Sequence, residues 1–324
     1  MANYIVTGAA GFIASRVTQM LLAQGHFVLG IDNLNDSYDP QLKHWRLAQL
    51  QQLPNFVFHQ ADIADFETVK ALCAGREYAA VFNIAGRAGV RASVENPWLF
   101  VQSNTVGTLN MLEICRLNKI PKFILSSTSS LYGDNAPLPT PETAESSQPL
   151  QPYAASKKGA EAMCHAYHFL HGIDVTVFRY FTVYGPAGRP DMVMFRFAKW
   201  IAEGKEVTIY GDGEQSRGFT YLDDIARGTI QGLQPVGYEI INLGGHEVIS
   251  LNEMIAILER KIGKKANTVY LPAQKADIRC SQADVSKARR LLGWEAQVSL
   301  DEGIQQLVDW YFREQDWAQH VATP

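Results

Sequence analysis

Cysteine is scarce in this sequence, and its few copies are not grouped. The 324 residues contain four cysteines, Cys73, Cys115, Cys164 and Cys280, without a CxxC pair and without histidines at metal-ligand spacing beside them. Zinc motifs need their ligands at short spacings, which this sequence lacks, and the scattered cysteines favour free thiols over a disulfide framework. We expect reduced, buried thiols in a cytoplasmic protein and no bound metal.

Long apolar runs and concentrated charge are also absent. No apolar stretch approaches the roughly 20 residues that cross a bilayer, and Met1 to Thr7 enters an apolar strand without a basic leader. Lys and Arg total 29 against 33 Asp and Glu, a formal net charge of -4, with no basic cluster. We therefore predict a protein that binds neither nucleic acid nor membrane and carries no secretory signal.

What the sequence does contain is an alternation of short apolar runs and amphipathic stretches over residues 1–180. This pattern is typical of βαβ units in a parallel sheet. The predicted strands are Tyr4–Thr7, Phe27–Ile31, Phe56–Gln60, Ala80–Ile84, Lys122–Ser126 and Val175–Arg179. The predicted helices are Ile13–Gln24, Glu67–Ala74, Pro97–Asn118 and Tyr153–His171. Right-handed crossovers between them give an α/β fold with a doubly wound, parallel sheet of the Rossmann type.

The pattern changes after Tyr184, at a break rich in Gly and Pro. The elements predicted beyond it are a helix at Val193–Glu203, strands at Glu206–Tyr210 and Tyr238–Leu243, and helices at Leu251–Gly263 and Leu300–Arg313. We expect the strand at Tyr238–Leu243, with its following helix beside it, to return to the main sheet. Residues 1–180 with 236–262 would form the cofactor domain, and residues 181–235 and 263–324 a smaller C-terminal α/β substrate lobe.

A glycine-rich turn after the first strand predicts a dinucleotide site. Gly8 permits the tight turn, Gly11 lets the backbone approach a pyrophosphate, and Ala14 allows close helix packing. Asp32 ends the second strand, where a carboxylate binds the adenosine ribose and repels a 2′-phosphate, which favours NAD over NADP. The cofactor-binding residues expected here are Gly8, Gly11, Phe12, Ile13, Asp32 and Asn33.

Two further features near this site have alternative interpretations. Asp62 and Ile63 follow the third strand and either flank the adenine or, in the case of Asp62, cap the helix that starts near Phe66. Asn104 is a poor helix former inside a predicted helix. It either fastens loops near the cofactor or lies on the surface.

A cluster of hydroxyls and a Tyr–Lys pair predict acid–base chemistry. Thr128 lies at the end of the fifth predicted strand, in LSSTSSLYG, and Tyr153 and Lys157 share one helix face because they are four residues apart. A phenol with its usual pKa of about 10 is protonated at neutral pH. We expect the Lys157 ammonium to lower that pKa and the Thr128 hydroxyl to share the substrate's proton.

The glycine turn, the hydroxyl cluster and YxxxK in this order resemble the extended short-chain dehydrogenase/reductase family over essentially the whole chain. The resemblance implies that Tyr153 is the acid/base and that Thr128 is the third catalytic hydroxyl. It also implies that Lys157 orients Tyr153 and binds the nicotinamide ribose of NAD.

Two segments resemble the UDP-glucuronate 4-epimerases within that family. They are NDSYDPQLKHWRL at Asn35–Leu47 and RYFTVYGPAGRPDM at Arg179–Met192. The substrate-binding residues that the resemblance implies are Ser129, Ser130, Thr182, Arg189, Arg217, Gln274 and Asp277. Arg189 would hold the sugar carboxylate with its planar fork; the alternative is a surface pair with Asp191.

The implied activity is reversible inversion at C4 of UDP-glucuronate through a 4-keto sugar, giving UDP-galacturonate. Alternatives are another UDP-hexose 4-epimerase, a UDP-glucuronate decarboxylase, or a catalytically silent NAD-binding sensor or scaffold. Ser129 and Ser130 stand where 4,6-dehydratases carry Asp-Glu, which disfavours dehydration. Silent relatives usually lose the Tyr or the Lys, and this chain keeps both.

Three positions depart from the family pattern. Asn83 and Gly86 replace the His and the last Ala of HxAA, near the expected nicotinamide pocket, and are expected to change cofactor retention or rate. Gly218 follows Arg217 where Asp is common and is expected to leave that loop less constrained.

The helices at Pro97–Asn118 and Tyr153–His171 have apolar faces that need a partner. We expect them to pair across a two-fold axis in a homodimer, as in related enzymes. The alternative is that these faces are satisfied within one subunit.

Overall fold

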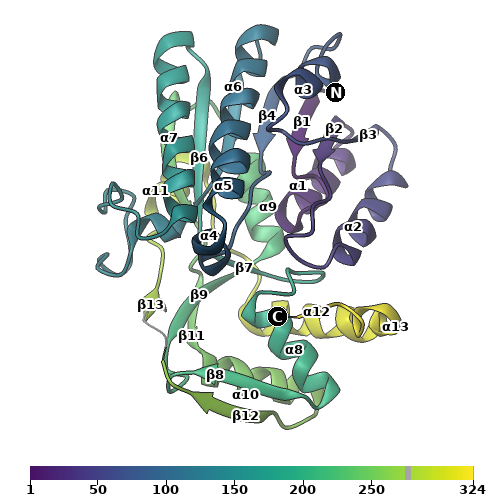
Figure 1. Ribbon diagram of the computed structural model, residues 1–324, viewed down its shortest axis with the longest axis vertical. Helices are drawn as coiled ribbons and strands as arrows, with labels where there is room; N and C mark the ends of the chain where they lie inside the picture. Colours follow the sequence, from purple (N-terminus) through teal and green to yellow (C-terminus); the bar gives the residue numbers. More distant parts are fainter. Residues whose placement is uncertain (274–278, 324) are drawn as a thin grey trace.

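A seven-stranded parallel sheet forms the centre of the larger part of the molecule (Figure 1). The computed structural model describes residues 1–273 and 279–323. The strand order is β3-β2-β1-β4-β5-β6-β10, and every neighbouring pair is parallel. The strands are β1 (Asn3–Thr7), β2 (Phe27–Asp32), β3 (Phe56–Gln60), β4 (Ala80–Asn83), β5 (Lys122–Thr128), β6 (Asp174–Tyr180) and β10 (Tyr238–Leu243). The predicted fold class and the return of the Tyr238 strand to this sheet are confirmed.

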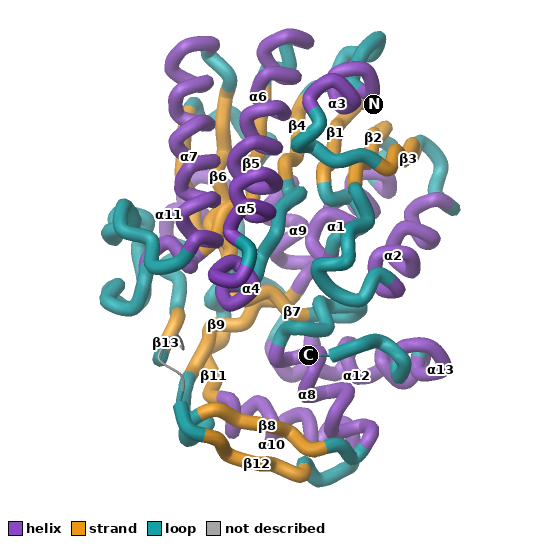
Figure 2. The backbone as a smooth tube through the Cα atoms, viewed as in Figure 1, coloured by secondary structure: helices purple, strands orange, loops and turns teal. Residues whose placement is uncertain are grey.

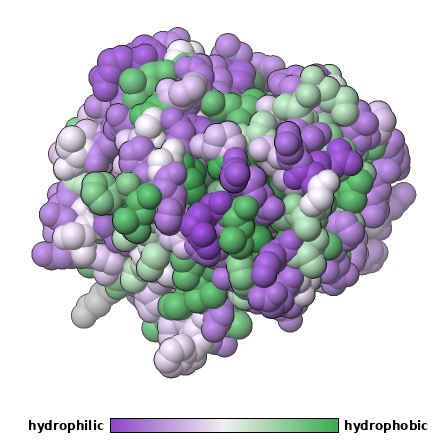
Figure 3. Space-filling view, turned by 90° about the horizontal axis from the view of Figure 1, so that it is seen from above, coloured by the Kyte–Doolittle hydropathy of each residue, from purple (hydrophilic) through white to green (hydrophobic). Residues whose placement is uncertain are grey.

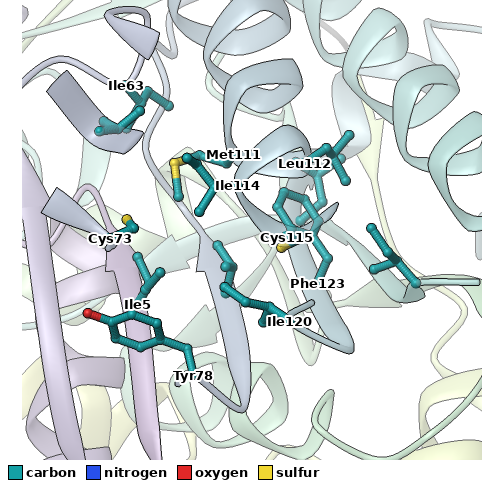
Figure 4. Packing of buried hydrophobic residues seen from close by; sticks show 14 of the residues in the cluster. Ile5, Ile63, Cys73, Tyr78, Met111, Leu112, Ile114, Cys115, Ile120 and Phe123 are labelled. Atoms are coloured by element: carbon teal, nitrogen blue, oxygen red, sulfur yellow. The ribbon is translucent and has the colours of Figure 1, made fainter. Parts of the chain in front are cut away.

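Helices cover both faces of the sheet because alternate strand residues point to opposite sides. Ile5 and Val81 pack with the helices of one face, while Val6 and Phe82 pack with those of the other. The first face carries α3 (Phe66–Leu72), α6 (Gly107–Asn118) and α7 (Pro152–His171), and Figure 4 shows part of its core. The second face carries α1 (Phe12–Ala23), α2 (Gln41–Gln51), α9 (Leu222–Gln231) and α11 (Ser286–Leu292).

The helix predicted at Pro97–Asn118 is present but is not a uniform α-helix. It consists of α5 (Pro97–Phe100), a π-helical segment η1 (Val101–Val106) and α6, and it follows the short α4 (Val90–Glu95). A π-helical segment inserted in an α-helix is often found at a functional site. Here it contains Asn104.

A smaller lobe lies below the large sheet in the tube view (Figure 2). Its strands are β7 (Thr182–Tyr184), β9 (Ser216–Tyr221), β11 (Glu247–Ser250) and β13 (Cys280–Ser281) in one sheet, and β8 (Glu206–Tyr210) and β12 (Asn267–Leu271) in another. Its helices are α8 (Val193–Glu203), α10 (Leu251–Ile262), α12 (Leu300–Arg313) and α13 (Gln315–Ala318). Phe197, Ile209, Phe219, Leu258 and Ile304 lie in its core. Among the described residues, no helix is long and apolar enough to cross a membrane.

Two helices pack differently from the expectation. The helix predicted at Leu251–Gly263 does not lie beside the main sheet, because the apolar face of α10, with Met254 and Leu258, packs against α8 and α12. Conversely α9, which follows β9 of the lobe, packs on α1 and the large sheet. The chain therefore crosses between the two parts more often than the sequence indicated.

Candidate functional site

A cavity of about 410 Å³ lies at the carboxyl ends of the parallel strands, where Thr182 to Met192 leads into the smaller lobe. Ligands of open α/β sheets bind at this edge. The predicted site residues that line the cavity are Gly8, Gly11, Phe12, Ile13, Asp32, Asn33, Asp62, Ile63, Thr128, Ser129, Ser130, Tyr153, Lys157, Thr182 and Arg189. The fold thus brings the expected cofactor residues, the expected catalytic residues and four of the expected substrate residues to one place.

The glycine turn forms a close-packed cradle at one end of this cavity. Gly8 has φ +72°, and a Cβ there would lie 2.8 Å from the Cα atom of Ala85. A Cβ on Gly11 would lie 2.8 Å from the carbonyl oxygen of Gly8, directly before α1 begins. Only glycine fits both positions, and the N-terminus of α1 offers its free N–H groups to an anion there.

Asp32 is fixed at the end of β2 by hydrogen bonds from two backbone N–H groups. Its Oδ2 accepts from Ala10 at 3.1 Å and its Oδ1 from Leu34 at 2.8 Å. The Nζ of Lys43 lies 3.9 Å from Oδ1. A buried carboxylate held in this way suits the ribose hydroxyls of NAD, so the residues present fit this cofactor.

Asp62 does not cap the helix that follows β3. The cap of α3 is Asp65, whose carboxylate accepts from the backbone N–H of Thr68 at 3.2 Å. Asp62 instead accepts from the backbone N–H of Ala64 and from the side chain of Asn33, both at 2.8 Å. Since Asp62 also lines the cavity, the helix-cap alternative is wrong, and the contact with adenine stays a prediction.

Tyr153, Lys157 and Thr128 meet where α7 starts and β5 ends. Tyr153 lies in the first turn of α7 and is hydrogen-bonded to Thr128. Lys157, one turn further along, donates from Nζ to the carbonyl oxygen of Ser126 at 2.8 Å. The side chains of this trio are buried, so a proton held by Tyr153 is screened from bulk water.

The electrostatics of the trio differ from the sequence-based expectation. Burial raises the pKa of the Tyr153 phenol, and the hydrogen bond to Thr128 and the charge of Arg189 only partly oppose this rise. Burial also lowers the pKa of Lys157 to about 8, although the charge of Glu161 opposes this. Desolvation therefore outweighs the expected lowering of the phenol's pKa, and the opposing cation is Arg189.

Asn104 joins the cavity wall to the catalytic helix. Its Oδ1 accepts from the backbone N–H of Arg87 at 2.9 Å, and its Nδ2 donates to the carbonyl oxygen of Arg87 at 3.0 Å and to Ser156 Oγ at 2.9 Å. Ser156 in turn donates to the carbonyl oxygen of Tyr153. Asn104 is buried, so the prediction that it fastens neighbouring loops is confirmed and the surface alternative is wrong.

Arg189 is paired with Asp191, but inside the cavity rather than on the surface. Two parallel bonds join the guanidinium to the carboxylate, from Nε at 3.0 Å and from Nη2 at 2.6 Å. Nη2 also donates to the carbonyl oxygen of Ala88 at 3.1 Å. Arg189 thus already binds one carboxylate in a planar fork, next to Tyr153.

The expected nucleotide-end residues are not shown to belong to the site. Arg217 is not among the described residues that line the cavity. It lies in β9 and donates to the carbonyl oxygen of Ser216. Gln274 and Asp277 lie outside the described residues. These three assignments stay predictions.

The four cysteines are free, and three of them, Cys73, Cys115 and Cys164, are buried as expected, whereas Cys280 is half-buried. Over residues 1–273 and 279–323, no group of His, Cys, Asp and Glu side chains could hold a metal ion.

Comparison with known proteins identifies the family. The model described as "NAD dependent epimerase/dehydratase family" matches residues 4–244. The chain belongs to this family. A UDP-glucuronate 4-epimerase of Thermodesulfobacterium geofontis is 55% identical over 311 residues, 96% of each protein.

Solved structures of this epimerase/dehydratase family share the fold. The UDP-glucuronic acid 4-epimerase of Bacillus cereus, in complex with UDP-glucuronic acid and NAD, superposes with a TM-score of 0.89 at 36% identity, covering 96% of this chain and 99% of that one. The UDP-glucose 4-epimerase of Thermotoga maritima, with UDP-glucose, superposes with a TM-score of 0.88 at 32% identity, covering 97% and 99%.

The departures from the epimerase/dehydratase pattern have structural explanations. Asn83 accepts from Thr7 Oγ1 at 2.8 Å and donates to Thr108 Oγ1 at 3.0 Å, so it ties β1 and β4 to α6 behind the cavity. A Cβ on Gly86 would lie 2.8 Å from Lys157 Nζ, so glycine leaves room for the ammonium. Gly218 does not loosen a loop: it pairs within β9, and a Cβ there would lie 2.5 Å from the Cα atom of Gly245.

Sequence reasoning missed several residues of this epimerase/dehydratase site. Tyr38, Lys43, Arg87 and Asp191 also line the cavity. Tyr38 and Lys43 belong to the segment Asn35–Leu47, which the resemblance had marked without assigning a role to its members. Periodicity does not reveal them, because they enter the site through a loop and through the buried side of α2.

The buried ammonium of Lys157 predicts a specific dependence of stability on pH. Its folded-state pKa of about 8 lies below its ordinary value of 10.5, so the unfolded chain binds more protons between these two values. Burial of Lys157 therefore costs no stability above a pH of about 10.5, where the side chain is neutral in both states. The cost grows as the pH falls and is complete below about 8, where the folded protein must bury the charged ammonium. We expect Lys157→Met, freed of NAD, to be about 1–2 kcal/mol more stable than the parent at pH 7, after allowance for the lost bond to Ser126.

Urea unfolding from pH 7 to pH 10 measures this difference, which should shrink above pH 8. Lys158→Met is the matched control, since the Lys158 side chain is 33% exposed and its loss should show no such window. A Lys157→Met variant that is less stable than the parent at pH 7 would contradict the prediction.

Proposed function

We propose that this protein catalyses the reversible C4 epimerisation of UDP-glucuronate to UDP-galacturonate through a 4-keto sugar. The observation that carries the proposal is the placement of a carboxylate-binding fork, Arg189, in the same cavity as Tyr153. Ser129, Ser130 and Thr182, which carry hydroxyl groups, line the same cavity. The similarity to named UDP-glucuronate 4-epimerases supports the same substrate.

Gly8, Gly11 and Asp32 would hold NAD along the first strands, and Lys157 its nicotinamide ribose. When bound, NAD would supply the hydride acceptor and hydride donor for C4 of the sugar. The protein's part is the proton: Tyr153 takes the proton of the C4 hydroxyl and later gives it back to the C4 oxygen. Thr128 shares that proton, and its hydrogen bond and the charge of Arg189 favour the phenolate that forms.

The carboxylate of the 4-keto intermediate must be restrained, because this intermediate is a β-keto acid. Its C5–C6 bond can break with release of carbon dioxide, leaving the electron pair as an enolate over C5, C4 and the C4 oxygen, which takes a proton at C5. The bond breaks when the carboxylate lies perpendicular to the plane of the ketone. Arg189, Thr182 and the two serines would hold it away from that orientation and so protect the uronate.

Other parts of the proposal follow the family resemblance. Arg217 would bind the diphosphate, and Gln274 and Asp277 the uridine ribose. Residues 1–180 with β10 would serve the cofactor, and 181–235 with 244–324, α10 included, the UDP-sugar, with α9 and α11 packed on the cofactor side. A cytoplasmic location agrees with the free thiols.

The test is incubation of the purified protein with UDP-glucuronate, without added reductant, followed by chromatography and proton NMR of the products. The proposal expects UDP-galacturonate. A UDP-pentose as the main product would instead indicate a decarboxylase. Unchanged UDP-glucuronate with conversion of UDP-glucose would indicate another hexose epimerase, and no conversion and no reduced-nicotinamide absorbance would indicate a silent binding protein.

A homodimer is also part of the proposal, formed by the long helix of Pro97–Asn118 and by α7. Apolar side chains on and near these helices are exposed, among them Trp98 at 77%, Met163 at 36% and Phe169 at 80%. The space-filling view from above shows hydrophobic patches between hydrophilic groups (Figure 3). Two-fold pairing would bury such side chains.

We expect the double variant Trp98→Glu, Met163→Glu to weaken the dimer by about 100-fold or more, because charge is placed in an apolar contact. Light scattering after size exclusion checks this against the subunit mass of 36.0 kDa. Phe312→Glu changes an exposed aromatic residue on α12 and should remain dimeric. A double variant with the parent's mass would contradict the assigned interface.

A further inference from the structure

The segment Asn35–Leu47 has no assigned role in the reaction, although it carries one of the two resemblances. It forms the loop after β2 and the first turns of α2, and it contains a buried arginine, Arg46, which is 3% exposed. A buried guanidinium is costly unless all of its donors are satisfied. The atoms that satisfy this one lie in the glycine turn, in the loop before Arg189 and in Tyr38 of the same segment.

Each of the five N–H donors of Arg46 has an acceptor within reach. Nε and Nη2 donate to the carbonyl oxygen of Ala187 at 3.1 and 2.6 Å, and Nη2 reaches that of Gly188 at 3.4 Å. Nη1 donates to the carbonyl oxygen of Ala10 at 3.1 Å and to the Tyr38 hydroxyl at 2.8 Å. All four acceptors are neutral oxygen atoms, so the planar fork, and not charge pairing, sets the geometry.

One of these acceptors lies in a strained part of the loop that carries Arg189. Ala187 has φ +51°, a left-handed conformation that costs a residue with a Cβ about 1 kcal/mol. Such a conformation persists only where its surroundings hold it. The two bonds from Arg46 to the Ala187 carbonyl supply that hold, two residues before Arg189.

Tyr38 extends the same contact to Arg189 itself. The Arg189 guanidinium lies over the Tyr38 ring at 5.6 Å from its centre, and the Arg46 guanidinium lies at the same distance from it. The carbonyl of Ala10 is on the glycine turn, and the N–H of Ala10 donates to Asp32. Arg46 therefore contacts the cofactor turn on one side and the Arg189 loop on the other.

We propose that Arg46 is a positioning residue, which sets the Arg189 loop against the cofactor turn so that the carboxylate of the 4-keto intermediate is held away from the orientation that decarboxylates. This inference rests on the proposed function. It gives one shared role to the segments Asn35–Leu47 and Arg179–Met192, since the Arg46 side chain of the former fixes the backbone of the latter.

The experiment compares the parent with Arg46→Met, Arg46→Lys and the control Arg16→Met, using UDP-glucuronate and separating UDP-hexuronates from UDP-pentoses. Arg16 also joins distant segments by a bidentate contact, to Asp223, but not through the loops of the cavity. We expect both Arg46 variants to lower kcat/KM by about 10- to 100-fold and to release UDP-pentose, because a misplacement of about 1 Å has costs of this size. Arg16→Met should keep the parent's rate and product.

A double variant with Arg189 tests whether Arg46 acts by positioning Arg189 or only stabilises the fold. In an Arg189→Ala background, adding Arg46→Lys should change the pentose fraction less than about twofold, because both changes act on the same group. The proposal would be overturned if the effects of the two substitutions on the pentose fraction were fully additive. It would also be overturned if Arg46→Lys kept the parent's rate and selectivity. A variant that loses bound NAD but keeps the parent's product ratio would overturn it as well. If Arg46→Met does not fold, Arg46→Lys decides. A parent that leaves UDP-glucuronate unchanged contradicts the proposed function itself.

Discussion

Replacing Tyr153 by Phe is expected to lower kcat for UDP-glucuronate by about 10²- to 10⁴-fold, the usual contribution of a positioned acid–base group. The phenol is buried and hydrogen-bonded to Thr128, and a phenyl ring can neither take a proton from the C4 oxygen nor return one. The measurement is the rate of product formation by NMR, with the content of bound NAD determined on the same sample.

Tyr167→Phe is the matched control for this loss. Tyr167 lies on the same helix, α7, and its hydroxyl donates to Glu113 at 2.6 Å, so this variant also removes one bonded hydroxyl. It should keep the parent's kcat. A Tyr153→Phe enzyme that retains more than about a tenth of the parent's activity would remove Tyr153 from the acid–base role.

The fold of the cofactor part could be predicted from the sequence because its elements are strongly periodic. The strand Phe56–Gln60 has the predicted bounds, and α7 begins one residue before the predicted Tyr153 and ends at the predicted His171. These segments are defined by local apolar patterns and by Gly or Pro at their ends. Short strands such as β13, and helices such as α11 after Leu271, carry too few residues for a period to be detected.

Tertiary packing was harder to predict than the elements themselves. The sequence predicts the helix of Leu251–Ile262 but not the elements against which it packs, because its apolar face fits either the main sheet or the helices of the lobe. Gly218 was interpreted as a source of freedom, whereas the structure shows a backbone contact with Gly245 that excludes a side chain. Contacts between segments far apart in the chain leave no local pattern in either one.

In the candidate site too, residues in local motifs could be predicted from the sequence, whereas contacts between distant segments could not. Gly8, Asp32, Tyr153 and Lys157 follow from motifs whose spacing is fixed by one turn or one helix face, and they line one cavity. The pKa of Tyr153 could not be predicted in this way, because it depends on burial and on the distant Arg189. Arg46 likewise acts through carbonyl groups of another segment.

Replacing Arg189 by Ala is expected to lower kcat/KM for UDP-glucuronate by about 30- to 5000-fold and to make UDP-pentose a product. The loss of one partner of a buried, bidentate charge pair costs about 2–5 kcal/mol, and each 1.36 kcal/mol is tenfold in rate. Arg189 holds the carboxylate of Asp191 by two bonds, so its fork already faces a carboxylate inside the cavity. Without the guanidinium, the carboxylate of the 4-keto intermediate would lose its bidentate donor.

Arg189→Lys separates charge from geometry, because an ammonium retains the charge but not the planar fork. We expect it to restore part of the affinity for UDP-glucuronate, while UDP-pentose is still formed. Binding of UDP, which has no uronate carboxylate, should change by less than about twofold in both variants, as measured by calorimetry. If Arg189→Ala epimerises UDP-glucuronate at the parent's rate without releasing carbon dioxide, the carboxylate is held by other residues, and Arg189 serves only to pair with Asp191.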